Sequence, residues 1–318
     1  IRIEQQSQFV TNLVMGMNKV IVGQKHLVDC LLIGLLSDGH ILLEGVPGLA
    51  KTLAIKTLSQ LISADYSRIQ FTPDLLPADV IGTQIYSQKD EAFHVKRGPV
   101  FANFVLADEI NRASPKTQSA LLECMEEGTA TIDGQTYPLK RPFFVIATQN
   151  PVETAGTYPL PEAQLDRFLI RLSLGYASRE EEIKILSAIG GEHPIGRVSA
   201  VVTKEEVNMA SREALGVPIN EAVLGYIADI GAATRSHEKI RLGLSARGLL
   251  ALKKTAQAYA AVNGQAFVTP DDVKAVAPYV IPHRIICREL ALRTSAKSAA
   301  EEIIEQLLAG VPVPTEEL

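Results

Sequence analysis

The segment at residues 45–52 constrains this chain more than any other part of it. It reads Gly-Val-Pro-Gly-Leu-Ala-Lys-Thr and directly follows the apolar stretch at residues 40–44. That context predicts a strand, a tight turn and then a helix, with several backbone N–H groups converging on phosphate oxygens. The helix adds its unpaired N–H groups and the positive end of its dipole. The pattern therefore predicts a site for a nucleoside triphosphate.

Two side chains at the end of this segment carry the expected chemistry. Lys51 is expected to place a positive charge at the β- and γ-phosphates, and the Thr52 hydroxyl is expected to bind Mg²⁺. Ala50 stands where the usual phosphate-binding loop has glycine, and alanine has poor access to positive φ. A plain Gly/Pro turn before a helix is the alternative, which the flanking strand and helix disfavour.

Apolar stretches alternate with helical patterns through the first half of the chain, which predicts an α/β unit with a parallel sheet. The expected strands cover residues 41–43, 68–71, 104–107, 143–148 and 168–174. The expected helices cover residues 53–62 and 114–127, with others in residues 5–36 around a break at Gly23. Asp133-Gly134 between β-prone residues predicts a hairpin over residues 129–139.

The pattern becomes helical after about residue 175. Thr203 and Thr269 stand at good helix-capping positions. The expected helices cover residues 178–189, 204–215, 220–234, 246–262, 270–280 and 296–308. The length of 318 residues suits two domains. We therefore predict an α/β nucleotide-binding domain at residues 1–175 and an all-helical domain at residues 176–318.

A second chemical motif follows the expected strand at residues 104–107. The strand ends in Asp108 and Glu109. Asp108 is expected to hold Mg²⁺ through water, and Glu109 to orient and polarise the attacking water of a hydrolysis reaction. A solvated acidic turn is the alternative, which the phosphate-binding segment upstream disfavours.

Asn150 follows the next expected strand, at residues 143–148. Its amide can contact the γ-phosphate or the attacking water. A turn-forming asparagine before Pro151 is the simpler alternative, and the other motifs are what favour the functional one.

Two arginines outside the first two motifs could also act on a bound nucleotide. Arg167 precedes the last expected strand and could neutralise charge on a neighbouring subunit's γ-phosphate. A surface pair with Asp166 is the alternative. Arg247 comes two residues after Ser245, an expected helix cap, and could sense nucleotide; a solvated arginine in the first turn is the alternative.

Taken in order, these motifs resemble those of an AAA+ ATPase, and more closely those of the MoxR family. The similar segments are residues 20–24, 45–52, 71–77, 97–101, 107–112 and 147–151. The resemblance extends over about residues 10–310, and Ala50 in place of glycine is itself typical of that family.

The resemblance implies a fold and a set of ligand-binding residues. The fold is a five-stranded parallel sheet with a helical lid and an inserted hairpin at about residues 81–95. Magnesium would be held by Thr52 and Asp108. The residues implied to bind ATP are Val22, Gly23, Gln24, Gly45, Val46, Pro47, Gly48, Leu49, Ala50, Lys51, Thr52 and Leu53.

It also implies ATP hydrolysis by a ring, usually a hexamer, that remodels client proteins in a chaperone-like way, often beside proteins with von Willebrand factor A domains. Whether Arg247 acts on its own nucleotide or on a neighbour's is left open. We expect a cytoplasmic protein with no membrane span, since no apolar run of about 18 residues exists. The three separate cysteines suit a reducing compartment.

Two other functions remain as alternatives. One is a binding module that nucleotide assembles, with incidental hydrolysis. The other is a nucleic-acid motor, which the net charge of −5 and the lack of Lys/Arg runs disfavour. Residues 283–293 are the most basic stretch, and we predict a solvated helix face there. A GTPase is disfavoured because no Asn-Lys-x-Asp signature is present.

Overall fold

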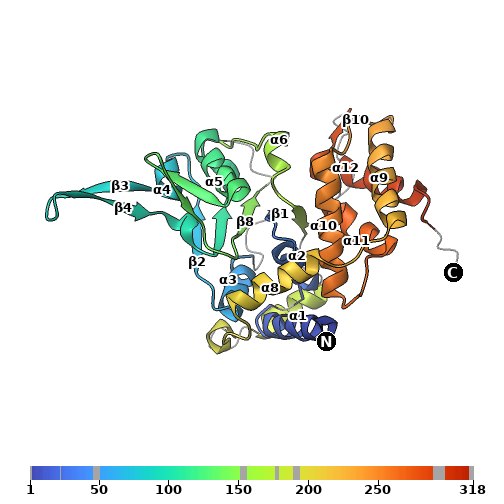
Figure 1. The fold of residues 1–318 in the computed structure, drawn as a ribbon, viewed down its shortest axis with the longest axis horizontal. Helices are drawn as coiled ribbons and strands as arrows, with labels where there is room; N and C mark the ends of the chain where they lie inside the picture. The colour runs from blue at the N-terminus through green and yellow to red at the C-terminus, as the bar shows by residue number, and fades with distance from the viewer. Residues whose placement is uncertain are drawn as a thin grey trace.

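The molecule is built around a five-stranded parallel sheet (Figure 1). The computed structural model describes residues 2–21, 23–45, 51–150, 156–175, 179–188, 194–288 and 298–314. The sheet strands are β1 (Ile41–Gly45), β2 (Tyr66–Gln70), β5 (Phe104–Asp108), β8 (Phe144–Gln149) and β9 (Ile170–Leu174). Their order is β2-β5-β8-β1-β9, and every pairing is parallel. The predicted sheet is therefore confirmed.

The central strands are apolar along most of their length because both faces of the sheet are covered. The first four residues of β1 and of β5 are buried, as are the first five of β8. The elements around them are α1 (Arg2–Asn18), α2 (Lys25–Leu36), α3 (Lys51–Leu61), α4 (Pro77–Ile81), η1 (Pro99–Phe101), η2 (Ile110–Arg112), α5 (Pro115–Glu127) and α6 (Glu162–Leu165). Polar residues are thereby left to the strand ends.

The ends of α5 follow local rules. Pro115 stands in its first turn, and the Ser114 hydroxyl caps it by accepting from the Thr117 amide at 3.4 Å. The helix ends at Gly128, whose φ of 64° suits glycine. These signals explain why the sequence located this helix closely.

Two hairpins extend the α/β unit. One pairs β3 (Gly82–Ser87) with β4 (Ala92–Arg97) and projects away from the body of the molecule (Figure 1). Gly82 begins it with a φ of 109°, and a Cβ there would lie 2.3 Å from the Lys96 carbonyl oxygen. The other pairs β6 (Thr129–Ile132) with β7 (Gln135–Pro138). Both predicted hairpins are present.

The C-terminal part is helical, as predicted. Its elements are α7 (Arg179–Ala188), η3 (Pro194–Arg197), α8 (Lys204–Leu215), α9 (Glu221–Ser236), α10 (Ala246–Val262), α11 (Pro270–Val280), η4 (Pro282–Arg284) and α12 (Ala299–Gly310). Capping boxes begin α8 at Thr203 and α11 at Thr269. One departure from an all-helical lid is the antiparallel pair of β10 (Ile240–Leu242) and β11 (Ile286–Cys287), strands too short to leave a periodic pattern.

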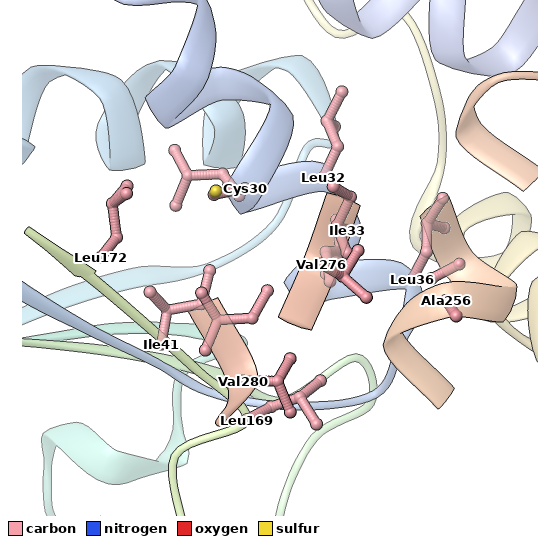
Figure 2. Packing of buried hydrophobic residues seen from close by; sticks show 14 of the residues in the cluster. Cys30, Leu32, Ile33, Leu36, Ile41, Leu169, Leu172, Ala256, Val276 and Val280 are labelled. Carbon is pink, nitrogen blue, oxygen red and sulfur yellow. The ribbon is translucent and has the colours of Figure 1, made fainter. Parts of the chain in front are cut away.

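A continuous hydrophobic cluster joins the sheet to the lid through α2. Figure 2 shows residues of α2, the sheet strands and the lid helices gathered in this cluster, with Leu36 of α2 near Ala256 of α10. Nine of the twelve residues of α2 are buried. The lid is thus packed onto the sheet unit by a shared core.

Two of the cysteines belong to the buried interior. Burial raises the pKa of Cys30 and of Cys124 to about 12, so both thiols stay protonated near neutral pH. Among the helices of the described ranges, none has both the length and the hydropathy to span a bilayer.

Candidate functional site

A polar cleft opens at the carboxyl edge of the sheet, outside the ends of β1, β2, β5 and β8. This edge is where parallel α/β sheets usually bind ligands. The described residues that line it are Gly45, Lys51, Thr52, Arg68, Gln70, Asp108, Glu109, Thr148, Gln149 and Asn150. The structure therefore brings together six predicted site residues from three separate segments: Gly45, Lys51, Thr52, Asp108, Glu109 and Asn150.

Lys51 is a buried cation of the cleft. It begins α3, is buried, and donates from Nζ to the Gly45 carbonyl oxygen at 3.0 Å. Burial lowers its pKa, while the carboxylates of Asp108 and Glu44 oppose that shift. Gly45 is held at a φ of 149°, and a Cβ there would lie 2.5 Å from the Leu174 carbonyl oxygen. An ammonium at the start of a helix suits an anionic ligand.

The remaining predicted nucleotide-binding residues fall into two groups. Val22, Val46, Pro47, Gly48, Leu49 and Ala50 lie outside the described residues. Gly23, Gln24 and Leu53 are described, and none of them is among the described residues that line the cleft. The Gln24 Oε1 atom is buried with no hydrogen-bond partner in the described part of the chain.

Asp108 is held from two sides. Its Oδ1 accepts from the Thr148 hydroxyl at 2.7 Å, and its Oδ2 pairs with the Arg68 guanidinium at 2.5 Å. The Asp108 carboxylate and the exposed Thr52 hydroxyl are the oxygen donors that Mg²⁺ prefers, so these residues fit such an ion. The Arg68 guanidinium already places a positive charge beside the Asp108 carboxylate.

Glu109 has an unusual backbone. Its φ of 55° and ψ of 51° are left-handed, which costs a non-glycine residue on the order of 1 kcal/mol. Its amide donates to the Thr148 hydroxyl at 2.9 Å. Its Oε2 accepts from Gln70 Nε2 at 3.0 Å and pairs with Arg112 at 3.1 Å. The carboxylate is thus held at the cleft by Gln70 and Arg112, and the backbone by Thr148.

Sequence reasoning missed the residues that hold the two carboxylates. Arg68 and Gln70 lie two apart on β2, and the strand register pairs Gln70 with Asp108. Arg68 also donates to the Gln70 amide oxygen at 3.1 Å. Two polar residues at alternate positions at the end of a predicted strand were the available signal. Thr148 ends the next strand in the same way.

An ion pair between buried Glu44 and partly exposed Arg171 lies beside the cleft at β1. Glu44 accepts from Gln149 and pairs with Arg171 Nη2 at 2.7 Å. All three residues are near strand ends, and the register aligns Glu44 with Gln149. This pair also went unpredicted, because it joins residues more than 100 positions apart.

Arg167 and Arg247 lie at the opposite edge of the sheet. They line a hollow with Asp38, His40 and Leu169, the residues that lead into β1 and β9. A strand of five residues spans about 17 Å. Within one chain, neither arginine is therefore part of the cleft.

The contacts of these arginines differ from the simpler alternatives. Arg167 pairs with Glu126 at 3.0 Å and not with its sequence neighbour Asp166. Arg247 pairs with Glu126 at 3.1 Å and with Asp166 at 3.6 Å, so it is not merely solvated. Ser245 caps α10 as predicted, accepting from the Gly248 amide at 3.2 Å.

The basic stretch that begins at His283 is not a solvated helix face in its described part, so that prediction is wrong. His283 and Arg284 lie in the short η4 helix and are buried. Burial lowers the pKa of His283 well below its usual range, and Nε2 pairs with the Phe168 carbonyl oxygen at 2.8 Å. Residues 289–293 lie outside the described residues.

Comparisons with known proteins agree with this architecture. Residues 40–170 match the family model described as "ATPase family associated with various cellular activities (AAA)", and residues 232–307 match an AAA lid domain. A crystal structure of a protein from Cytophaga hutchinsonii, inferred to be an ATPase, aligns with a TM-score of 0.89 and 44% identity over 98% of each chain.

Sequence relatives extend over nearly the whole chain. The uncharacterized protein YeaC of Bacillus subtilis is 48% identical over 94% of this chain and 93% of its own. Chaperone MoxR1 of Mycobacterium tuberculosis is 44% identical over 93% of this chain and 80% of its own. Protein MoxR of Paracoccus denitrificans is 28% identical over 94% of both chains. With its AAA sheet domain, its AAA lid and this similarity, the chain belongs to the MoxR family of AAA+ ATPases.

Proposed function

We propose that the cleft binds ATP with Mg²⁺ and hydrolyses the γ-phosphate bond. The observation that carries this proposal is the convergence of a buried ammonium, Lys51, with two carboxylates, Asp108 and Glu109, at the carboxyl edge of the sheet. Lys51 would hold the phosphates from the start of α3. Thr52 and Asp108 would hold Mg²⁺, which would offset negative charge on the phosphates.

The chain's own residues divide the remaining work. Glu109 would accept a proton from the attacking water, since its carboxylate is fixed in the cleft by Gln70 and Arg112. Asn150 lines the same cleft and would orient that water or contact the γ-phosphate. Both side chains line the cleft in which they would act.

A second chain would complete the site. Arg167 and Arg247 lie at the opposite edge of the sheet, so they can reach a nucleotide only in a neighbouring copy. A ring places one edge of each chain against the other edge of the next, which is what a head-to-tail interface does. We propose that Arg167 and Arg247 both act in this way, and that six copies form the ring.

Glu109→Gln tests the hydrolysis step. The variant keeps the shape of the side chain but cannot accept the proton, so we expect normal ATP binding by calorimetry and turnover reduced by about 100-fold or more. Glu123→Gln, an exposed position on α5, is the matched control and should keep its turnover. Unchanged hydrolysis in Glu109→Gln would remove this residue from the mechanism.

The work done by hydrolysis is proposed to be remodelling of client proteins, as the name of Chaperone MoxR1 suggests for that relative. The projecting β3–β4 hairpin carries exposed apolar side chains at Ile85, Tyr86 and Phe93, which suit contact with a client. A partner with a von Willebrand factor A domain, and action in the cytoplasm, are part of the same proposal.

A nucleotide-gated assembly module is the competing function. It uses the same cleft and needs no turnover. Light scattering with and without ATP, beside a phosphate-release assay, separates the two. Assembly without phosphate release would favour the module.

A further inference from the structure

We propose that Glu126 is a positioning residue that holds Arg167 and Arg247 together for use on a neighbouring chain. This inference rests on the proposed action of those arginines across a subunit interface. Nothing in the sequence pattern marks Glu126, which stands in the last turn of α5 among other acidic residues.

One carboxylate joins two separate parts of the molecule. Glu126 Oε2 pairs with Arg167 Nε at 3.0 Å, and Glu126 Oε1 pairs with Arg247 Nη1 at 3.1 Å. Arg167 precedes β9 in the sheet unit, whereas Arg247 begins the lid helix α10. The three side chains are only partly exposed, at 33% for Glu126, 27% for Arg167 and 51% for Arg247. Glu126 therefore bridges the two arginines, and Asp166 adds a longer contact of 3.6 Å to Arg247.

The contacts leave the arginines able to bind an anion. A guanidinium has five N–H donors in a fixed fork. Arg167 meets Glu126 through Nε, which leaves both of its terminal groups out of this ion pair, whereas Arg247 meets Glu126 through one terminal group, Nη1. The carboxyl end of α5 also favours nearby cations, because helix carbonyls there carry partial negative charge. Both features orient the guanidiniums without consuming them.

A buried arginine fixes the segment that carries Arg167. Arg284, from the lid, pairs with Asp166 at 2.8 Å and donates to the carbonyl oxygens of Phe168 at 2.7 Å and Leu169 at 3.1 Å. Burial lowers the pKa of Arg284 to about 10, so it remains charged near neutral pH. The backbone on both sides of Arg167 is thus held, and Glu126 then fixes the direction of its side chain.

Glu126→Gln tests this role because it keeps the shape of the side chain and removes its charge. We expect turnover to fall by about 10- to 100-fold, the effect of misplacing a group that stabilises the transition state. ATP affinity should stay within about twofold, since the variant's own cleft is intact. Glu127→Gln is the matched control, because Glu127 is exposed and forms no ion pair with another described residue.

Mixing experiments separate a positioning role from a structural one. Glu126→Gln chains have an intact cleft, and Glu109→Gln chains have intact arginines. Mixed in equal amounts, they should hydrolyse ATP several-fold faster than either variant alone. Wild-type turnover in Glu126→Gln, or an equal loss in Glu127→Gln, would overturn the proposal.

A parallel mixture separates the role of Glu126 from the proposed action of the arginines across the subunit interface. Arg167→Ala mixed with Glu109→Gln tests action across the interface directly. Recovery there without recovery in the Glu126→Gln mixture would show that the arginines act in trans but that Glu126 does not position them. No recovery in either mixture would overturn the trans arrangement, and the role of Glu126 with it.

Discussion

At the scale of single residues, the carboxylates of the cleft are restrained before any ligand arrives. Arg68 neutralises Asp108, while Gln70 links Arg68 to Glu109. Thr148 contacts both acids, through the carboxylate of Asp108 and the amide of Glu109. Such preorganisation limits the reorganisation that a reaction would otherwise require.

His40 provides a prediction about pH at the same scale. The Val145 amide donates to Nδ1 at 3.0 Å, so Nε2 carries the proton and faces the Met125 carbonyl oxygen at 3.2 Å. Burial lowers the pKa of His40 to about 4, against 6.5 for an ordinary histidine. Between those values the unfolded chain binds a proton that the folded chain does not. The contribution of His40 to the free energy of unfolding is therefore complete above pH 6.5 and is lost as the pH falls toward 4.

The loss attributable to His40 is about 3 kcal/mol, from about 1.4 kcal/mol for each unit of pKa difference. Urea unfolding of the wild type and of His40→Gln at pH 7 and pH 4.5 measures it. The variant should be less stable at pH 7 because it loses buried contacts, and its stability should depend less on pH across this window. Equal pH dependence in both proteins would contradict this account.

The position of a residue at the cleft could be predicted where its own strand or helix places it there. Lys51, Asp108 and Asn150 follow directly from strand ends and a helix start. Prediction failed for residues that strand pairing brings together. The hydrogen bond between Gln70 and Glu109 is an example, because the strand order and the register must be known before it can be predicted. The ion pairs of Glu126 could not be predicted for the same reason, since its partners Arg167 and Arg247 are distant in sequence.

At the scale of elements, side-chain caps allowed the limits of several helices to be predicted, although α12, which Ser298 caps, begins at Ala299 and not at the predicted residue 296. The limits of α8, α10 and α11 agree with the predicted residues 204–215, 246–262 and 270–280, and each helix begins at a side-chain cap. The short α4, α6, β10 and β11 went unpredicted, since two to five residues cannot show a period. Tertiary contacts, and not local pattern, decide such elements.

The β3–β4 hairpin gives a prediction at this scale. Tyr86 and Phe93 face each other with ring centroids 5.2 Å apart, and they are 51% and 69% exposed. Changing both to serine should alter the free energy of unfolding by only about 0.5 to 1 kcal/mol, because little apolar area is buried there. Basal ATP turnover should be retained, while capture of clients by a Glu109→Gln background should fall.

Thermal melting, phosphate release and quantitative pull-down measure these three properties. Thr83→Ser, an exposed polar change on the same hairpin, serves as the control. Client capture that is unaffected by the loss of both aromatic rings would remove the hairpin from client binding.

At the scale of the whole molecule, the shared core of lid and sheet and the placement of the arginines opposite the cleft act together. The lid and the sheet unit share a continuous hydrophobic core, so one chain has little freedom to bring its amino-edge arginines to its carboxyl-edge cleft. The residues proposed for hydrolysis are therefore divided between two faces of one chain. Only assembly can reunite them, which makes the oligomer part of the proposed active site.

The most direct measurement of this central claim is ATP turnover per chain as a function of protein concentration, with size followed by light scattering in the same samples. The account predicts that turnover per chain rises with concentration as rings form, and that Arg167→Ala stays low at every concentration although it binds ATP. Constant turnover per chain from monomer to assembly would contradict it.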